Sequence, residues 1–160
     1  MYYSWFESPV GNLLLVGSRT GLKLLSFGVG KQARRFDPEW QADSSAFVEA
    51  VEQLQSYFAG ERTNFDVPLL LEGTDFQKKV WTTLQKIPYG ETISYKDLAE
   101  AVGNPKAVRA VGAANGANPI PIIIPCHRVI GNDGSLTGFG GGLPLKKQLL
   151  ELESRQMKLI

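Results

Sequence analysis

The sequence predicts an α/β protein in two parts, a small strand-and-helix domain at residues 1–71 and a helical domain at residues 72–160. Short apolar runs between turn residues fill the first part of the chain, a pattern typical of strands. Beyond it, apolar residues recur at helical spacing behind capping residues. A chain of 160 residues, 43% of them apolar, can bury a substantial core as one domain or as two that share an interface.

Two antiparallel strands are predicted near the N-terminus. Residues 13–16 follow a turn at residues 9–12, and residues 22–27 follow Gly21. Further along, Pro68 interrupts an extended pattern at residues 65–71. Because proline cannot donate a backbone hydrogen bond, we expect an edge strand or a connection there.

Residues 45–59 predict a helix with one buried face. Gly60 follows it, and glycine suits the left-handed conformation found just past a helix end. The positions at helical spacing, which define the predicted inner face, are Phe47, Val48, Val51, Leu54, Gln55 and Phe58.

The C-terminal part begins with a helix that Thr74 or Asp75 can cap, and it ends with a helix at residues 143–159. Between them, residues 131–142 contain six glycines. We expect this segment to be a loop whose backbone approaches a ligand closely and forms one wall of a pocket.

The centre of this part predicts a helix-turn-helix. Ser94 can cap a helix at residues 95–102, and a glycine turn at residues 103–105 leads into a helix at residues 106–115. A DNA-binding unit and a plain helical hairpin fit this layout equally well. The second helix is rich in alanine and glycine, which favours either close packing on a neighbouring helix or docking in a narrow DNA groove.

The only cysteine and the only histidine of the chain, Cys126 and His127, are adjacent and precede Arg128. An imidazole and a guanidinium beside a thiol predict a lowered thiol pKa and a nucleophile at neutral pH. The alternative is a small buried residue at a strand end beside a satisfied polar neighbour, since free cysteine is among the most buried residue types.

The sequence around this pair resembles the O6-alkylguanine-DNA alkyltransferases, also called methylated-DNA–protein-cysteine methyltransferases. The matching segments are residues 93–95, 109–112, 118–130, 141–143 and 149–153. The resemblance implies a ribonuclease H-like N-terminal domain and a winged-helix-like C-terminal domain. It also implies a DNA-repair methyltransferase that moves an alkyl group from O6-alkylguanine, and from O4-alkylthymine, to Cys126. The transfer is irreversible, so each molecule acts once.

The resemblance further implies the catalytic residues. Cys126 is the nucleophile, and His127 is a base that acts through a water because adjacent residues of an extended segment face opposite ways. Glu153 would hold the imidazole, although a solvated helix residue is the alternative. Tyr95 would donate a proton toward guanine N3 and press on the phosphate to turn the base out of the stack.

Four further residues are implied in DNA binding. Arg109 would fill the space that the flipped base leaves, and Ala110 lies on the same helix. Asn118 would act as a hinge between that helix and the active-site segment, and Lys146 would support the tyrosine or the leaving oxygen. Ordinary surface or turn positions are the alternatives for Arg109 and Asn118. Phe139 stands where many family members have a tyrosine, so its hydroxyl is missing here.

Composition narrows these expectations. One cysteine and one histidine are too few for a structural zinc site, so we expect no metal, and the resemblance implies no cofactor. The chain has no run of about 20 apolar residues and no secretory signal, which predicts a cytoplasmic protein without membrane contact. Residues 72–160 hold 11 Lys and Arg against 8 Asp and Glu, whereas residues 1–71 hold 6 against 8, so the C-terminal part is the one expected to meet phosphate.

The expected partner is double-stranded DNA that carries O6-alkylguanine, bound by a monomer, and clustering of several molecules on the DNA is the alternative left open. Three other functions are alternatives. An alkyltransferase-like protein that only recognises the lesion lacks the acceptor cysteine, which is present here. A regulator that senses cysteine alkylation needs a second DNA-binding function, and a cysteine hydrolase would turn over repeatedly.

Overall fold

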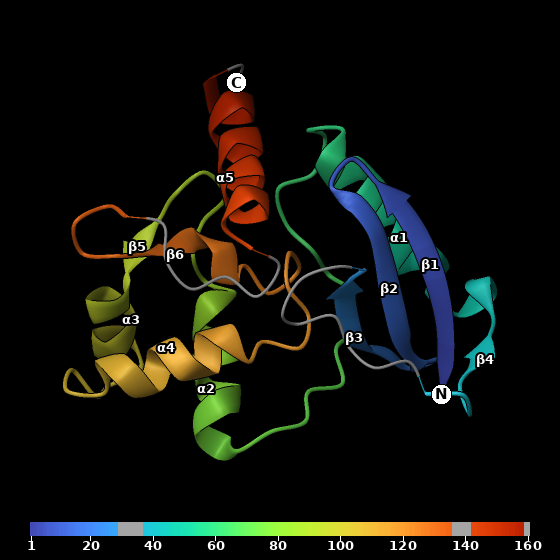
Figure 1. Cartoon of the computed structure of the whole chain (residues 1–160), viewed down its shortest axis with the longest axis horizontal. Coiled ribbons are helices and arrows are strands. Elements are labelled where there is room, and N and C mark those ends of the chain that lie inside the picture. The colour runs from blue at the N-terminus through green and yellow to red at the C-terminus, as the bar shows by residue number, and fades with distance from the viewer. Residues whose placement is uncertain (29–36, 136–141, 159–160) are drawn as a thin grey trace.

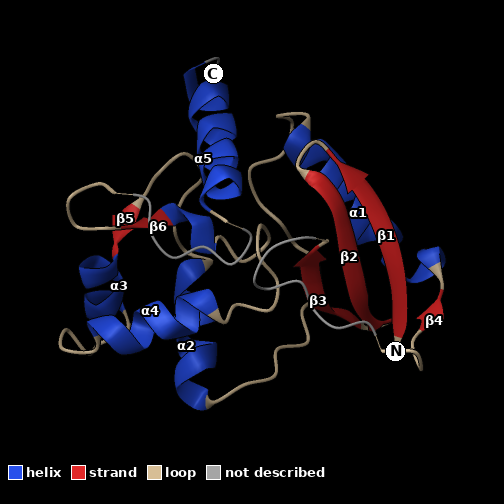
Figure 2. Ribbon diagram, in the orientation of Figure 1, coloured by secondary structure: helices blue, strands red, loops and turns tan. Residues whose placement is uncertain are grey.

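The computed structural model describes residues 1–28, 37–135 and 142–158, and it confirms a mixed α/β fold. A four-stranded sheet and the helix at residues 48–58 form one side of the molecule, and the helices at residues 75–84, 95–101 and 108–116 form the other (Figure 1). The C-terminal helix at residues 143–158 stands above the other helices of the helical side in this view, and Figure 2 shows the same division into a strand-rich and a helix-rich side.

The sheet is mainly an antiparallel meander. Its strands are β1 (Tyr2–Ser8), β2 (Gly11–Ser18), β3 (Gly21–Phe27) and the short β4 (Gln41–Ala42). They lie in the order β3-β2-β1-β4, and β4 pairs with β1 in parallel. The predicted antiparallel pair is therefore confirmed as β2 and β3. For residues 65–71 the sequence predicted either an edge strand or a connection. The structure shows a connection, which contacts the edge of β3 through a single bridge between Leu22 and Leu69.

Helix α1 (Val48–Phe58) follows a short 3-10 helix, η1 (Ser44–Phe47). Gly60 has a φ of 78°, so the predicted left-handed end is confirmed. The predicted inner face is wrong in part, because Val48 is 54% exposed. The residues of α1 that are buried are Ala50, Gln53, Leu54 and Tyr57.

Two of the three helices on the helical side begin with side-chain caps. Helix α2 (Asp75–Leu84) and helix α3 (Tyr95–Ala101) each begin with a capping box, made by Thr74 with Gln77 and by Ser94 with Asp97. Both predicted caps are confirmed. Helix α4 (Val108–Gly116) begins two residues later than predicted, since Ala107 is not helical.

Two short elements connect this side to the cysteine. Strands β5 (Ile93–Ser94) and β6 (Val129–Ile130) pair in parallel. This pairing brings the start of α3 beside the residues that directly follow Cys126, His127 and Arg128. The Trp81 indole donates to the Ala114 carbonyl at 2.8 Å and joins α2 to α4. Helix α5 (Leu143–Lys158) completes this side.

One continuous hydrophobic core connects the two sides. It includes Leu15 from the sheet, Leu54 from α1, Trp81 from α2 and Leu149 from α5. The core therefore fixes the sheet and α1 against the helices that carry the candidate site. No helix in the described ranges is long and apolar enough to cross a membrane.

Candidate active site

The segment that leads to Cys126 folds back on itself. The Ile124 amide donates to the Ile120 carbonyl at 2.9 Å, and Pro121 forms a bridge with Ile124. Ile122 has a φ of 74°, which is rare for a β-branched residue and costs about 1–3 kcal/mol. Because Ile122 is fully packed, its surroundings hold this conformation and fix where the next residues begin.

Two buried asparagines fasten this turn to helix α4. The Asn118 side chain donates to the Ile124 carbonyl at 2.8 Å and accepts from the Ile120 amide at 2.9 Å. The Asn115 side chain donates to the Cys126 carbonyl at 3.4 Å. Asn118 therefore does join α4 to the cysteine segment, while its predicted part in DNA binding stays a prediction.

Cys126, His127 and Arg128 form a 3-10 helix, η2 (Cys126–Arg128), and not the extended segment that we expected. Successive side chains in a 3-10 helix point about 120° apart and so do not face each other directly. All three residues are buried. The imidazole and the thiol are therefore separated, as the sequence predicted, but the reason is the 3-10 helix and not an extended backbone.

The Cys126 thiol is not acidic in this structure. Burial raises its pKa to about 11, and Asn118 and the charge of Lys146 oppose this rise without cancelling it. The prediction of a lowered thiol pKa from the neighbouring imidazole and guanidinium is therefore wrong. Arg128 and His127 direct their charge-bearing groups to Glu153 instead, so the resting sulfur is a neutral thiol.

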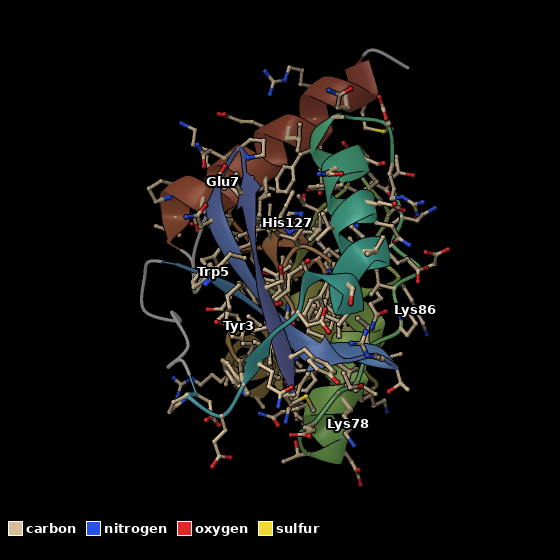
Figure 3. The ribbon with its side chains drawn as sticks, turned by 90° about the vertical axis from the view of Figure 1, so that its right-hand side faces the viewer. Tyr3, Trp5, Glu7, Lys78, Lys86 and His127 are labelled. Carbon is tan, nitrogen blue, oxygen red and sulfur yellow. The ribbon has the colours of Figure 1, made fainter. Side chains whose placement is uncertain are left out.

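His127 is completely enclosed, with an exposed fraction of 0%. Its Nε2 lies 2.7 Å from Glu153 Oε2, and its Nδ1 is buried with no hydrogen-bond partner among the described residues. Burial lowers the pKa of His127, although the Glu153 carboxylate raises it. A neutral imidazole donating from Nε2 to Glu153 leaves Nδ1 free to accept a proton. Figure 3 labels His127 near the middle of the molecule.

Glu153 of α5 connects the other groups. Burial raises the pKa of its carboxyl group, but hydrogen bonds and charge from His127 and Arg128 outweigh burial and lower that pKa to about 2. Arg128 donates from Nε to Oε1 at 2.8 Å and from Nη2 to Oε2 at 3.1 Å. The predicted pairing of Glu153 with His127 is present in the structure, and its catalytic role stays a prediction.

Sequence reasoning missed two residues of this cluster. Arg128 was considered only as a neighbour of the thiol, yet it also donates to the Ile87 carbonyl at 2.7 Å and is 5% exposed. Tyr57 was missed because the predicted inner face of α1 did not include it. Its hydroxyl donates to Glu153 Oε2 at 2.6 Å. The spacing of Ala50, Leu54 and Tyr57 along the helix was the available signal.

Lys146 lies inside the molecule with an exposed fraction of 0% and donates to the Val129 carbonyl at 2.6 Å. Burial lowers the pKa of Lys146, and the nearby Cys126 raises it. The predicted part of Lys146 in DNA binding, as support for the tyrosine or the leaving oxygen, stays a prediction. Lys146 ties α5 to the strand that follows the cysteine.

The remaining predicted residues lie on the surface side of the site. Tyr95 begins α3 and is half-buried, and a side chain in place of Gly112 would meet its ring at 3.7 Å. Arg109 and Ala110 are exposed on α4. The structure thus separates them from the buried cluster around Glu153. Phe139 lies outside the described residues.

A buried thiol beside an imidazole and carboxylate pair defines a protein with a candidate cysteine nucleophile. Helices α3 and α4, joined by a tight turn, add a helix-turn-helix of the kind that binds DNA. The described ranges contain no group of three or more His, Cys, Asp or Glu side chains placed to hold a metal ion. Fold and site together therefore define a cysteine-dependent protein with a DNA-binding type of domain.

Comparison with known proteins identifies the family. Residues 1–71 match the model of the 6-O-methylguanine DNA methyltransferase ribonuclease-like domain, and residues 75–155 match that of its DNA binding domain. The chain belongs to the methylated-DNA–protein-cysteine methyltransferase family. The exact domain boundary, between residues 71 and 72, stays a prediction.

Two relatives illustrate the similarity. A methylated-DNA–protein-cysteine methyltransferase of Methanosarcina acetivorans is 54% identical over 153 residues, which are 96% of this chain and 98% of that protein. The crystal structure of Mycobacterium tuberculosis OGT in complex with DNA has a TM-score of 0.91 and 51% identity, with 98% of this chain and 94% of that chain covered. The similarity thus includes both parts of the fold.

Proposed function

We propose that this protein repairs DNA by direct damage reversal, taking an alkyl group from O6-alkylguanine in double-stranded DNA onto Cys126. The observation that carries the proposal is the buried Cys126 next to the His127 and Glu153 pair, in a chain that matches a methyltransferase family over both parts. The proposed setting is the cytoplasm, and the proposed acting unit is a monomer. O4-alkylthymine is proposed as a second substrate.

The proton of the thiol has to leave before sulfur can attack, because burial raises the pKa of Cys126 to about 11. His127 Nδ1 is a buried ring nitrogen without a hydrogen-bond partner among the described residues, and a single water would link it to the thiol. Glu153 accepts from Nε2 and stabilises the imidazolium that forms. The resting thiol is therefore neutral, and His127 removes its proton in the course of the reaction.

Alkyl transfer then exchanges one bond for another. The sulfur electron pair forms a bond to the alkyl carbon, the bond from that carbon to O6 breaks, and its electron pair passes to O6 and the ring. Tyr95 supplies a proton to ring N3 and regains one from the solvent, while His127 passes the thiol proton through the bridging water to the solvent. The proton lost by the thiol therefore balances the one gained by guanine. The product is a thioether, which is stable, so each molecule acts once.

Access to the sulfur requires a flipped base. Cys126 is 5% exposed, and the alkylated atom faces the interior of the duplex. The exposed face of α4, where Arg109 and Ala110 lie, is the proposed contact with the DNA groove. Its small side chains fit a minor groove about 6 Å wide. Arg109 would occupy the gap in the stack while the base is in the pocket.

The test is a count of guanine restored per molecule of protein. Duplex DNA with one O6-methylguanine is mixed in excess with the wild-type protein and with Cys126→Ala. We expect one equivalent of guanine from the wild type and none from the variant. Repeated turnover would support a hydrolase instead, and lesion binding without restoration would support a recognition-only protein.

A further inference from the structure

Tyr57 brings a side chain of the strand-rich side to the carboxylate that holds His127. It lies in the last turn of α1, is fully buried, and donates to Glu153 Oε2 at 2.6 Å. The same oxygen lies 2.7 Å from His127 Nε2. The imidazole and the phenol therefore share one carboxylate oxygen.

Aromatic packing holds the Tyr57 ring in place. Its centroid lies 5.2 Å from that of Phe58, 5.4 Å from that of Phe65 and 6.1 Å from that of Tyr89. The contacts with Phe58 and Tyr89 are edge-to-face, a favourable arrangement for aromatic rings. The hydroxyl is thus presented to Glu153 by a rigid side chain and not by a mobile one.

The charged and titratable groups around Glu153 come from several elements. Tyr57 belongs to α1, Tyr89 lies between α2 and β5, and His127 and Arg128 belong to η2. Lys146 of α5 also acts on His127 and lowers its pKa. Among the described residues, hydrogen bonds to Oε2 come from Tyr57, His127 and Arg128, whereas Oε1 accepts one from Arg128 alone.

We propose that Tyr57 is a positioning residue of the alkyl-transfer reaction, which fixes the Glu153 carboxylate and limits how strongly it attracts a proton onto His127. The proposal rests on the proposed function, since it concerns the same base. A carboxylate oxygen that loses one donor becomes a stronger acceptor for those that remain. Without the Tyr57 hydroxyl, the imidazolium is therefore favoured, and less of His127 is free to act as a base.

The test compares Tyr57→Phe with Tyr89→Phe. Each change removes one buried phenol hydroxyl from the same aromatic cluster and keeps the ring. The Tyr89 hydroxyl has no hydrogen-bond partner among the described residues, which makes this variant the matched control. The single-turnover rate of methyl transfer is measured against pH for both variants and the wild type, and circular dichroism verifies the fold.

Removal of the Tyr57 hydroxyl should move the acid side of the rate profile upward by about 0.5 pH unit and lower the rate below that midpoint about threefold. Tyr89→Phe should leave the midpoint where it is in the wild type. A purely structural role would lower thermal stability without moving the midpoint, and an unmoved midpoint in folded Tyr57→Phe would overturn the proposal. A wild type that transfers no methyl group would instead overturn the proposed function.

The imidazole gives a second readout that does not depend on transfer. Because the chain has one histidine, ¹⁵N NMR of labelled histidine reports on His127 alone. Its titration should move upward in Tyr57→Phe and not in Tyr89→Phe. If Tyr57→Phe does not fold, the hydrogen bond can be tested in the wild type. The hydroxyl proton of Tyr57 should exchange slowly with water and should therefore be visible by NMR. Its absence would contradict the hydrogen bond on which the proposal depends.

Discussion

The cluster around Glu153 and the exposed face of α4 differ in almost every physical respect. Glu153 accepts hydrogen bonds from Tyr57, His127 and Arg128, and all four residues are buried. Arg109 on α4 is exposed. The difference shows that the groups proposed for proton transfer are fixed before DNA arrives, whereas those proposed for DNA contact are left open to it.

The largest expected effect comes from breaking the buried cluster. Glu153→Gln should slow methyl transfer by about 100-fold, because the imidazolium loses its carboxylate. It should also lower the free energy of unfolding by about 3 kcal/mol, because Arg128 keeps a buried charge without its partner. Rapid-quench kinetics and urea unfolding measure the two effects.

The control for this change is Glu151→Gln on the same helix. Glu151 is exposed and lies 3.9 Å from Lys147 in a surface pair, which contributes little to stability. Both quantities should remain within error of the wild type. If Glu151→Gln and Glu153→Gln behave alike, the buried cluster has no special role.

Acid should weaken the same cluster from within. The pKa of Glu153 is lowered to about 2 in the folded protein from an ordinary value of 4.5, so its contribution is fully present above pH 4.5 and is lost as the pH falls toward 2. The loss amounts to about 3 kcal/mol. The difference in unfolding free energy between the wild type and Glu153→Gln should therefore shrink over this range. A difference that stays constant would contradict the lowered pKa.

A substitution on the exposed face of α4 should slow the reaction with duplex DNA without slowing the alkyl-transfer step itself. Arg109→Ala should slow reaction with duplex DNA about 30-fold, equivalent to the loss of roughly 2 kcal/mol of contact, and leave reaction with free O6-methylguanine base unchanged. Lys106→Ala removes one exposed charge just before α4 and serves as the control for charge alone. Equal losses on duplex and free base would exclude a role of Arg109 in the DNA stack.

The smallest of these expected effects belongs to Tyr95, which is half-buried at the start of α3. Tyr95→Phe should slow methyl transfer about tenfold, since it removes one hydrogen bond of about 1.4 kcal/mol to the developing charge on guanine. The comparison of duplex with free base is informative here, because a proton donor acts on both substrates. An unchanged rate on the free base would remove the acid role.

Local signals in the sequence predicted the parts of the fold that depend on local chemistry. Thr74, Ser94 and Gly60 cap or end helices as expected, because caps depend on side chains a few residues away. The inner face of α1 could not be predicted as well. Apolar residues such as Val48 also occur at exposed positions, and only the tertiary packing decides which side of α1 is buried.

The predictions about the site had the same limit. The resemblance named Glu153 as the partner of His127, and the two are in contact. Burial raises the pKa of Cys126 and encloses Lys146, and neither effect is visible in a linear sequence, because burial depends on residues far away in the chain. Tyr57 reaches Glu153 across 96 positions for the same reason.

Intact mass measurement with peptide mapping, after the protein has reacted with excess duplex DNA containing one O6-methylguanine, examines the acceptor itself. We predict a single added methyl group, located on Cys126, and restored guanine in the DNA. A protein of unchanged mass, or a methyl group on any residue other than Cys126, would contradict the proposed transfer.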